Sequence, residues 1–394
     1  FRLARRTICS FSKRIQRGMH MKRRDFLGRA GAGALIGGGM LAGCSQSDAP
    51  GPAGSTAPAA AAKTIHWKMV TTWPKNFPGL GTGANNLARL IGELSGGRLQ
   101  VKVFGAGELV PAMQVFDAVS QGTAELGHGA AYYWKGKTPT AQFFAAVPFG
   151  LTAQEMNAWL YHGGGLELWR EVYEPFGLVP AAAGNSGVQM AGWFNREINE
   201  LADLQGLKMR IPGLGGEVLQ RAGGTPVQMP GGEIFTSLQS GAIDATEWVG
   251  PYNDLAFGLH KAAKYYYYPG WHEPGTTLEG LVNRAALERL PADLQSIVMN
   301  ACRVVNEDML AEYTARNKDA LQTLVNEHQV DVRRLPEAVL ARLRTLSEEA
   351  VAEIGGSDTL SGKVFDSFSR FRSQVEAWQD ISERAYLNVR GAGA

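Results

Sequence analysis

The stretch that decides the fold runs LADLQGLKMRIPG from residue 201 and resumes at residue 223 as GGTPVQMPGGEIFTSLQSGAIDATEW, ending at residue 248. Its pattern predicts a compact β/α unit: a strand carrying Arg210, a helix, a strand at 225–229, a second helix and a third strand. Glu247 and Trp248 follow the third strand. An arginine and a carboxylate at strand ends of one layer are well placed to meet a small anion and its counter-cation.

The chain before this unit also alternates between strands and helices. Strands are predicted at 65–70, 99–104 and 125–131, with helices between them. This β-α-β-α-β order predicts a largely parallel sheet covered by helices, in which ligands bind beyond the carboxyl ends of the strands. About 330 residues follow position 63, which is enough for two α/β domains.

The C-terminal region has a helical character. Residues 291–328 include some 35 without an internal Pro or Gly, patterned with apolar side chains at helical spacing. This predicts either one long helix that packs against a second chain or two helices joined without a breaker. A strand at 330–335 and helices at 337–355 and 363–389 are expected to follow.

The N-terminal region predicts export. Residues 21–43, MKRRDFLGRAGAGALIGGGMLAG, have the basic start and short apolar run of a twin-arginine signal peptide. The run ends in the lipobox-like LAGC, which predicts lipidation of Cys44, although cleavage without a lipid is the alternative. Residues 44–63 are expected to form a flexible tether, and 1–20 an upstream translated segment.

The charge balance excludes a nucleic-acid-binding class. Residues 1–43 hold 10 of the 39 Lys and Arg and 1 of the 37 Asp and Glu, so the formal charge moves from +2 to −7 without them. No basic surface is therefore expected on the mature domain. Cys302 is the single cysteine beyond residue 44, so no intramolecular disulfide is expected, and we interpret it as a core residue.

The sequence contains none of several well-known catalytic motifs. The sequence lacks HExxH, GxSxG and any cysteine cluster suited to zinc or iron–sulfur binding. The glycines at 79–83 do not have the spacing of a dinucleotide-binding fingerprint. The seven histidines are scattered, and His272 has no ligand-like partner nearby in sequence. The sequence therefore does not predict an enzyme.

Several side chains can instead hold an anion and a cation. Arg210 offers a planar fork for a carboxylate, although it could equally be a surface charge. Glu247 and Glu273 near one cleft would repel each other unless a cation intervened, and two separate surface glutamates are the alternative. Gln189 can add an amide oxygen, Tyr132 or Tyr133 a hydroxyl, and Trp134 and Trp248 apolar walls.

Residues 203–244, with DLQGLKMR, GGTPVQM and EIFTSLQSGAID, resemble the signature of the solute receptors of TRAP transporters, the DctP family. The segments KMVTTWPKNFPGLGTGA, GGEVLQ, TEWVGPYND and YYYPGWHEPG are similar to its 2-oxoacid-binding branch, often labelled mannitol/chloroaromatic compound-binding. The resemblance covers most of residues 64–390. It implies a two-domain α/β receptor with the periplasmic-binding-protein fold and a ligand cleft between the domains.

The resemblance also implies the domain ranges and partners. Domain I would comprise 64–185 and 249–285, and domain II 186–248 and 286–390. The receptor would bind a small monocarboxylate, a 2-oxoacid such as pyruvate or a 2-hydroxy acid such as lactate. It would deliver the solute to the small and large membrane subunits of a TRAP permease. It would also form a homodimer through a long helix near 291–328.

The site residues follow from the same resemblance. Arg210 would clamp the solute carboxylate, with Tyr133, Gln189, Trp248 and Asn185 also binding the solute. A bridging sodium or calcium ion would be held by four residues, namely Gln189, Glu247, Glu273 and the main-chain oxygen of Trp248. Two other functions remain open: a receptor for a sugar acid, C4-dicarboxylate or aromatic acid, and an oxidoreductase exported by the twin-arginine route.

Overall fold

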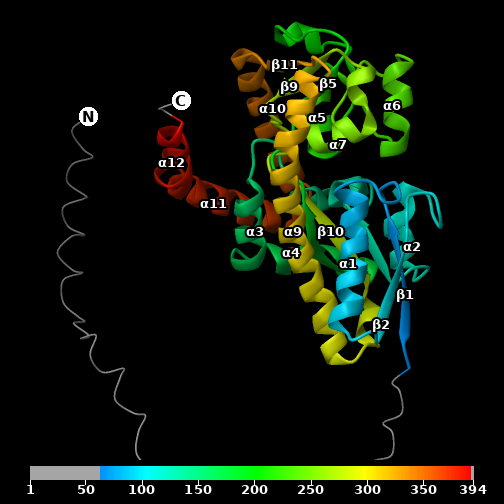
Figure 1. Ribbon diagram of the computed structural model, residues 1–394. Coiled ribbons are helices and arrows are strands. Elements are labelled where there is room, and N and C mark those ends of the chain that lie inside the picture. The colour runs from blue at the N-terminus through cyan, green and yellow to red at the C-terminus, as the bar shows by residue number, and fades with distance from the viewer. Residues whose placement is uncertain (1–62, 392–394) are drawn as a thin grey trace, which may run out of the picture. The chain divides into compact units, whose positions relative to one another are not determined.

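Two β-sheets organise the part of the chain that the structure, a computed structural model, describes, which is residues 63–391. The first sheet has five strands in the order β2-β1-β3-β10-β4, and the second has six in the order β11-β9-β5-β8-β6-β7. Figure 1 shows both sheets beside the long helix α9 (Ala292–Asn326). The expected two-sheet α/β class is confirmed. The expected signal peptide, lipobox and tether lie outside the described residues.

The first sheet is parallel over three strands and antiparallel at β10. Helices α1 and α9 share one apolar cluster against it, and α2 and α4 pack on the other side. Its strands are β1 (Ile65–Thr71), β2 (Leu99–Phe104), β3 (Leu126–Gly129), β4 (Leu178–Asn185) and β10 (Thr277–Asn283). The helices around it are α1 (Leu80–Leu94), α2 (Val115–Ser120), α3 (Ala153–His162), α4 (Gly165–Tyr173) and α8 (Arg284–Glu288).

The second sheet contains the stretch quoted at the start of the sequence analysis. Its strands are β5 (Gly192–Phe194), β6 (Lys208–Arg210), β7 (Thr225–Val227), β8 (Ala245–Thr246), β9 (Tyr265–Tyr268) and β11 (Asp331–Arg334). Its helices are α5 (Gly213–Arg221), α6 (Gly231–Gln239), α7 (Pro251–Phe257) and α10 (Glu337–Gly355). The strand at 225–229 is shorter than expected, and β6, β7 and β8 run parallel.

The chain crosses between the two sheets three times: once through α8 and α9, which lead from β10 to β11, and twice through short segments that contribute to the site. Residues 186–191 connect β4 in the first sheet to β5 in the second, and residues 269–276 connect β9 back to β10. Strand β9 therefore belongs to the second sheet, although the expected ranges place it in domain I. The reason is pairing: β9 hydrogen-bonds to β5 and β11. No sequence pattern of β9 alone reveals those partners.

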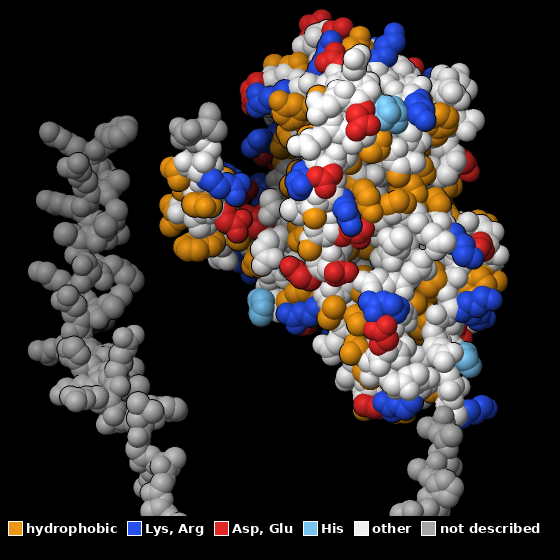
Figure 2. All heavy atoms as spheres, viewed as in Figure 1, with side chains coloured by type: hydrophobic (Ala, Val, Ile, Leu, Met, Phe, Trp, Pro, Cys, Tyr) orange, Lys and Arg blue, Asp and Glu red, His pale blue; other side chains and the backbone are white. Residues whose placement is uncertain are grey.

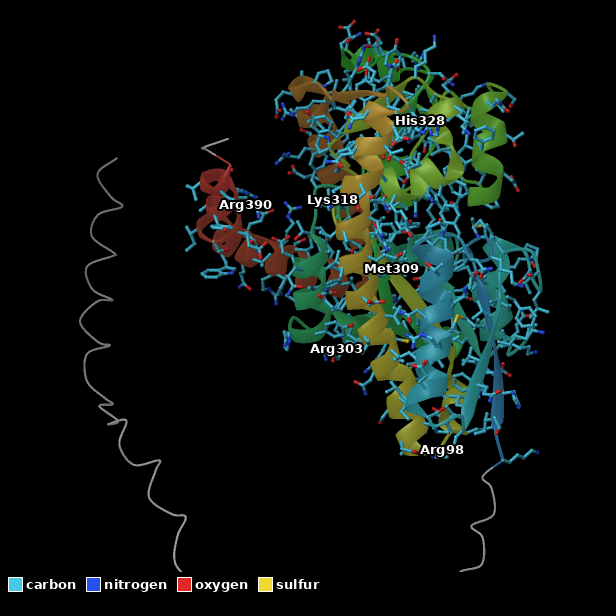
Figure 3. All side chains as sticks on the ribbon, in the orientation of Figure 1. Arg98, Arg303, Met309, Lys318, His328 and Arg390 are labelled. Atoms are coloured by element: carbon cyan, nitrogen blue, oxygen red, sulfur yellow. The ribbon has the colours of Figure 1, made fainter. Side chains whose placement is uncertain are left out.

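Helix α9 is a single helix of 35 residues, so the expectation of one long helix is correct and the two-helix alternative is wrong. No Pro or Gly interrupts it, and its buried side chains include Val298, Cys302 and Met309. Arg303, Met309 and Lys318 lie along it, and His328 follows its end (Figure 3). The thioether of Met309 packs where Gly83 and Gly184 leave room, because a Cβ at either glycine would collide with it. The helix thus packs against its own chain.

The C-terminal helices α11 (Thr359–Ile381) and α12 (Glu383–Arg390) extend away from the sheets, as Figure 1 shows. Large apolar side chains at the end of α11 and on α12 are exposed: Trp378, Ile381, Tyr386, Leu387 and Val389. In Figure 2 hydrophobic side chains gather on this segment. Among the described residues, no helix has the length and apolar character needed to cross a membrane.

Candidate functional site

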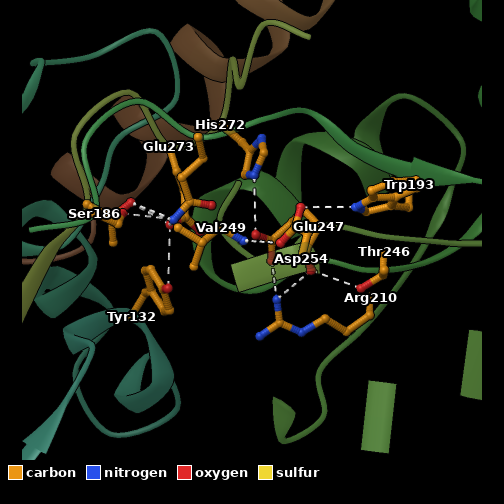
Figure 4. Close-up of polar contacts among 12 residues, drawn as sticks. Tyr132, Ser186, Trp193, Arg210, Thr246, Glu247, Val249, Asp254, His272 and Glu273 are labelled. Carbon is orange, nitrogen blue, oxygen red and sulfur yellow. Dashed lines mark hydrogen bonds and ion pairs between the residues drawn. The ribbon is translucent and has the colours of Figure 1, made fainter. Parts of the chain in front are cut away.

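The two crossing segments are hydrogen-bonded to each other beside the ends of β6 and β8. The backbone N–H of Gln189 donates to the carbonyl of Glu273 at 3.1 Å, and the Gln189 amide donates to the Glu273 carboxylate at 2.8 Å. Arg210 ends β6, and Glu247 follows its parallel neighbour β8. Because strand ends in one sheet lie at one edge, Arg210 and Glu247 come together there (Figure 4).

Arg210 is 1% exposed and forms a buried ion pair with Glu247. Its Nη1 also donates to the Glu247 carbonyl at 3.0 Å, and its Nη2 donates to the Tyr133 hydroxyl at 3.4 Å. Burial alone would lower the pKa of Arg210, but the Glu247 carboxylate raises it above its ordinary value. The guanidinium therefore stays charged.

A second carboxylate fixes the segment that carries Glu247 and Trp248. Asp254, on α7, is buried and accepts hydrogen bonds from the Trp193 indole at 3.0 Å and the Tyr266 hydroxyl at 2.7 Å. It also accepts the backbone N–H of Val249 at 3.3 Å (Figure 4). Burial raises the pKa of Asp254 to about 7. Asp254 thus ties residues 247–249 to the second sheet.

Three titratable side chains meet in the centre of the site. Glu247, His272 and Glu273 each offer one ligand atom, and these atoms lie within 4.8 Å of one another. His272 Nε2 lies 3.5 Å from Glu247 Oε2. Burial raises the pKa of Glu247 to about 7 although Arg210 opposes it, and burial together with Glu247 raises that of Glu273 to about 7. Burial lowers the pKa of His272 to about 4, so His272 is neutral at neutral pH.

Several buried polar atoms of this cluster have no hydrogen-bond partner among the described residues. The acceptors are Gln189 Oε1 and Glu247 Oε2, and the donors include Arg210 Nε. Buried polar atoms are nearly always paired, so this concentration of unpaired atoms indicates a polar ligand. The Gln189 amide oxygen beside the carboxylates of Glu247 and Glu273 fits a hard cation, and the Nε side of the Arg210 guanidinium fits an anion.

A small cavity adjoins the cluster. The volume over which the centre of a water molecule can move inside it is about 10 Å³. The cavity therefore has room for roughly one water molecule. Polar groups at its wall are Tyr132, Tyr133, Ser186 and Gln189, and apolar groups are Trp73, Leu80, Trp248, Val249 and Leu278. Arg210 and Trp248 are also in contact, with the guanidinium carbon 5.1 Å from the indole centroid. A ligand of this cavity must be small.

The structure brings together most of the residues expected at the site. Gln189, Tyr133 and Trp248 line the cavity, and Arg210, Glu247 and Glu273 form the charged cluster beside it. Asn185 is placed differently. It is buried, donates to the Gly275 carbonyl at 3.3 Å and accepts from the Gly187 N–H at 2.8 Å, so it braces the two crossing segments instead of lining the cavity. Its contact with solute stays a prediction.

His272 and Trp73 are among the site residues that the sequence pattern did not predict. His272 meets Glu247, which lies 25 positions earlier, so only the tertiary structure supplies its partner. In the sequence, the position of His272 next to Glu273 was the feature that could have pointed to the site. Trp73 stands in the loop after β1, far in sequence from every other lining residue except Leu80. For Trp73, the tryptophan in the turn sequence TTWPKNFPG was the feature that could have pointed to the site.

Residues 69–358 match the family model described as bacterial extracellular solute-binding protein, family 7 (DctP). A curated relative from Nostoc sp. PCC 7120 is 42% identical over 368 residues, covering 93% of this chain and 98% of the relative. That protein is described as a monocarboxylate 2-oxoacid-binding periplasmic protein. The match thus spans nearly the whole chain.

Solved structures agree with this match. A TRAP periplasmic solute-binding protein from Pseudoalteromonas atlantica, with bound sodium and pyruvate, is 43% identical with a TM-score of 0.81, covering 83% of this chain and 99% of that one. A TRAP solute-binding protein from Bordetella bronchiseptica, a mixed-occupancy dimer with calcium and picolinate in one site, is 38% identical with a TM-score of 0.82, covering 84% and 98%. This chain belongs to the DctP family of TRAP transporter solute-binding proteins.

Proposed function

We propose that this protein is a solute receptor that binds a small 2-oxo monocarboxylate, such as pyruvate, together with a sodium or calcium ion. The observation that carries the proposal is the group of unpaired buried atoms, an Arg210 donor beside Gln189 and Glu247 acceptors. A solute carboxylate with a neighbouring oxygen complements both kinds of atom at once. The relatives with bound pyruvate and sodium, or picolinate and calcium, support the same pairing.

In this proposal Arg210 receives the solute carboxylate along its Nε–Nη2 edge. Nη1 is already used by Glu247. Within residues 63–391, Nε has no hydrogen-bond partner and Nη2 has only the 3.4 Å contact with Tyr133. Two parallel N–H groups match the two oxygens of a carboxylate. Tyr133 is then within reach of the same solute, because its hydroxyl already meets this edge of the guanidinium.

The cation would be held by oxygens of Gln189, Glu247 and Glu273, with the Trp248 carbonyl as a further ligand. Hard cations such as calcium take carboxylate and amide oxygens. Burial favours protonation of Glu247 and Glu273, and a bound cation would favour their charged forms instead. The cation would thus supply the charge balance that lets both carboxylates and a solute anion share one buried site.

We further propose that the protein works outside the cytoplasm. The family is extracellular by description, and the sequence predicts a twin-arginine signal and lipidation at Cys44. In such a role the receptor hands its solute to the small and large membrane subunits of a TRAP permease. The site contains binding groups for a solute and a cation, and nothing in the proposal requires chemistry on the solute.

Calorimetry with pyruvate, lactate, picolinate and succinate tests the proposal. The protein is dialysed with chelator into a sodium-free potassium buffer and titrated before and after calcium or sodium is restored. We expect pyruvate to bind only when one of these cations is present. If picolinate binds and pyruvate does not, the solute is an aromatic acid. Absence of binding by every 2-oxo and 2-hydroxy acid with either cation would overturn the proposal.

A further inference from the structure

We propose that Trp73, held in place by His128, is the wall that limits the length of the solute's carbon chain. This inference rests on the proposed function, because it concerns the apolar end of the same small carboxylate. Neither residue belongs to the group that would bind the carboxylate or the cation. Trp73 is 2% exposed and lines the cavity beside the charged cluster.

The indole of Trp73 is fixed by a hydrogen bond to a buried histidine. Its Nε1–H donates to His128 Nδ1 at 2.7 Å. Since an indole nitrogen can only donate, Nδ1 must accept, and the imidazole proton must stand on Nε2. That Nε2 lies 3.0 Å from the Ala183 carbonyl and donates to it. Burial lowers the pKa of His128 to about 4, which keeps the imidazole neutral and Nδ1 free to accept.

The acceptor for His128 comes from an irregularity in the first sheet. The pairing of β4 with β10 shifts register between Leu278 and Glu279, so that Ala183 has no partner in the ladder. Such a bulge leaves a backbone group free for another bond. The chain from Trp73 through His128 to Ala183 therefore anchors the indole to the sheet. The Trp73 carbonyl is held as well, by the N–H of Ala106 at 2.8 Å.

The cavity has a polar side and an apolar side. Tyr132, Tyr133 and Gln189 reach toward Glu273 or Arg210, so these groups mark the end where the carboxylate and cation would sit. Ser186 accepts a hydrogen bond from the Gln189 amide and so belongs to the same polar side. The rest of the lining is apolar and is left for the carbon chain of the solute: Trp73, Leu80, Trp248, Val249 and Leu278. The Trp73 ring lies 6.2 Å from Tyr133 and 6.3 Å from Trp248 between ring centroids.

Trp73 is the residue of this apolar wall best suited to set a length limit. Its only polar atom is used by His128, so it offers the solute an apolar surface and no hydrogen bond. Its anchor prevents it from turning aside, and the cavity has room for about one water. A pocket of fixed size lowers the affinity for a ligand by roughly tenfold or more for each methylene group added to it. We therefore expect affinity to fall from pyruvate to 2-oxobutyrate to 2-oxovalerate.

The test compares dissociation constants for these three acids, in the presence of calcium, between wild type and variants. Trp73→Leu should lower the ratio of the 2-oxovalerate constant to the pyruvate constant at least about tenfold. Trp73→Phe should give a ratio between those of wild type and Trp73→Leu. It replaces Trp73→Leu as the test if that variant does not fold. His128→Leu should lower the ratio too, since it frees the indole. His128→Gln should retain the wild-type ratio, because its amide can both donate and accept.

Trp67→Leu is the matched control. Trp67 is a buried tryptophan on β1, the strand that precedes Trp73. It packs in the apolar cluster that α1 and α9 share on the other side of the sheet, so its loss should leave the ratio unchanged. If wild type binds pyruvate and both Trp73 variants keep the wild-type ratio, the length-limiting role is refuted while the proposed function stands. If wild type binds no 2-oxo acid, the proposed function itself fails.

Discussion

Arg210 and Glu247 show how one buried ion pair can prepare a binding site. Each is 1% exposed, and burying two charges is costly unless they are paired and hydrogen-bonded. Their pairing uses Nη1 of the arginine and Oε1 of the glutamate, while Nε and Oε2 have no hydrogen-bond partner in the described part of the chain. The pair therefore offers one donor edge and one acceptor at the same place. A carboxylate and a cation can occupy them without breaking the pair.

Two substitutions of Arg210 distinguish the effect of its positive charge from the effect of its planar shape. Arg210→Lys keeps a positive charge beside Glu247 but replaces the fork with a single ammonium, so pyruvate affinity should fall at least about tenfold. Arg210→Ala should also lower the free energy of unfolding by about 3–5 kcal/mol, because Glu247 is left buried without its partner. Calorimetry and urea unfolding measure the two effects. The surface variant Arg221→Ala should change neither. Unchanged pyruvate affinity in both Arg210 variants would contradict the clamp.

Glu279 predicts a pH dependence of stability outside the site. It is buried on β10, accepts hydrogen bonds from Trp134 and Tyr173, and burial raises its pKa to about 7 from an ordinary 4.5. Between these values the unfolded chain loses a proton that the folded protein keeps. The contribution of Glu279 to the free energy of unfolding is therefore complete below pH 4.5 and is lost as the pH rises through 7.

Urea unfolding at pH 5, 6 and 7 checks this prediction. The free energy of unfolding of wild type should fall, relative to that of Glu279→Gln, by at most about 1.4 kcal/mol per pH unit over this range. Other buried carboxyl groups titrate in both proteins and cancel in the difference. The exposed Glu353→Gln serves as the control and should parallel wild type. Parallel curves for Glu279→Gln and wild type would refute the assignment.

At the scale of elements, the two long helical regions have different surroundings. Helix α9 packs on β4, α1 and α7 of its own chain, and ten of its side chains are buried there. On α12, by contrast, none of the described side chains is buried, and Tyr386, Leu387 and Val389 are 50–71% exposed. Exposed apolar surface of this kind indicates an interface. We therefore expect a homodimer contact at α11–α12 in place of the region near 291–328.

Deletion of residues 382–394 tests this expectation. Sedimentation or light scattering should show a dimer for the full chain and a monomer for the truncated chain. Pyruvate affinity should stay within about twofold, because none of the residues 382–391 lines the cavity. A truncated chain that remains dimeric would place the contact elsewhere. A full chain that is monomeric at micromolar concentration would refute the dimer.

At the scale of the whole molecule, the site is closed. Arg210, Glu247 and Glu273 are at most 3% exposed, so a solute cannot reach them without movement of the surrounding segments. Two of the segments that connect the sheets, 186–191 and 269–276, carry Gln189 and Glu273 and hold part of the site between them. Opening between the two sheets is the simplest movement that exposes the site. Solute and cation together would favour the closed arrangement, since only that arrangement completes both sets of contacts.

Small-angle scattering provides the corresponding measurement. The radius of gyration of wild type should decrease when pyruvate and calcium are both added, and should change less with either alone. Arg210→Ala should not show the decrease at the same pyruvate concentration. A wild-type radius that is identical with and without both ligands would show that binding does not require closure.

The sequence by itself determined the elements and the residue types at their ends. Strand and helix patterns, the uninterrupted run at 292–326, and the placement of Arg210 and Glu247 at strand ends are local properties, set by hydrophobic period and backbone preference. Local patterns do not reveal which strands pair, so the pairing of β9 with β5 and β11 could not be predicted. The roles of the site residues were predicted from resemblance to a family. The sequence pattern alone did not distinguish an arginine and two glutamates of a binding site from ordinary charged residues on the surface.

Only the tertiary structure decided which distant residues share a cavity. His272 meets Glu247 and Trp73 meets His128 through packing between segments 25 and 55 residues apart, and no periodicity encodes such contacts. It also placed Asn185 in the framework of the crossing segments. The physical reason is burial. A carboxylate, an imidazole or an indole becomes a site residue through the neighbours that remove it from water, and those neighbours are chosen by the fold.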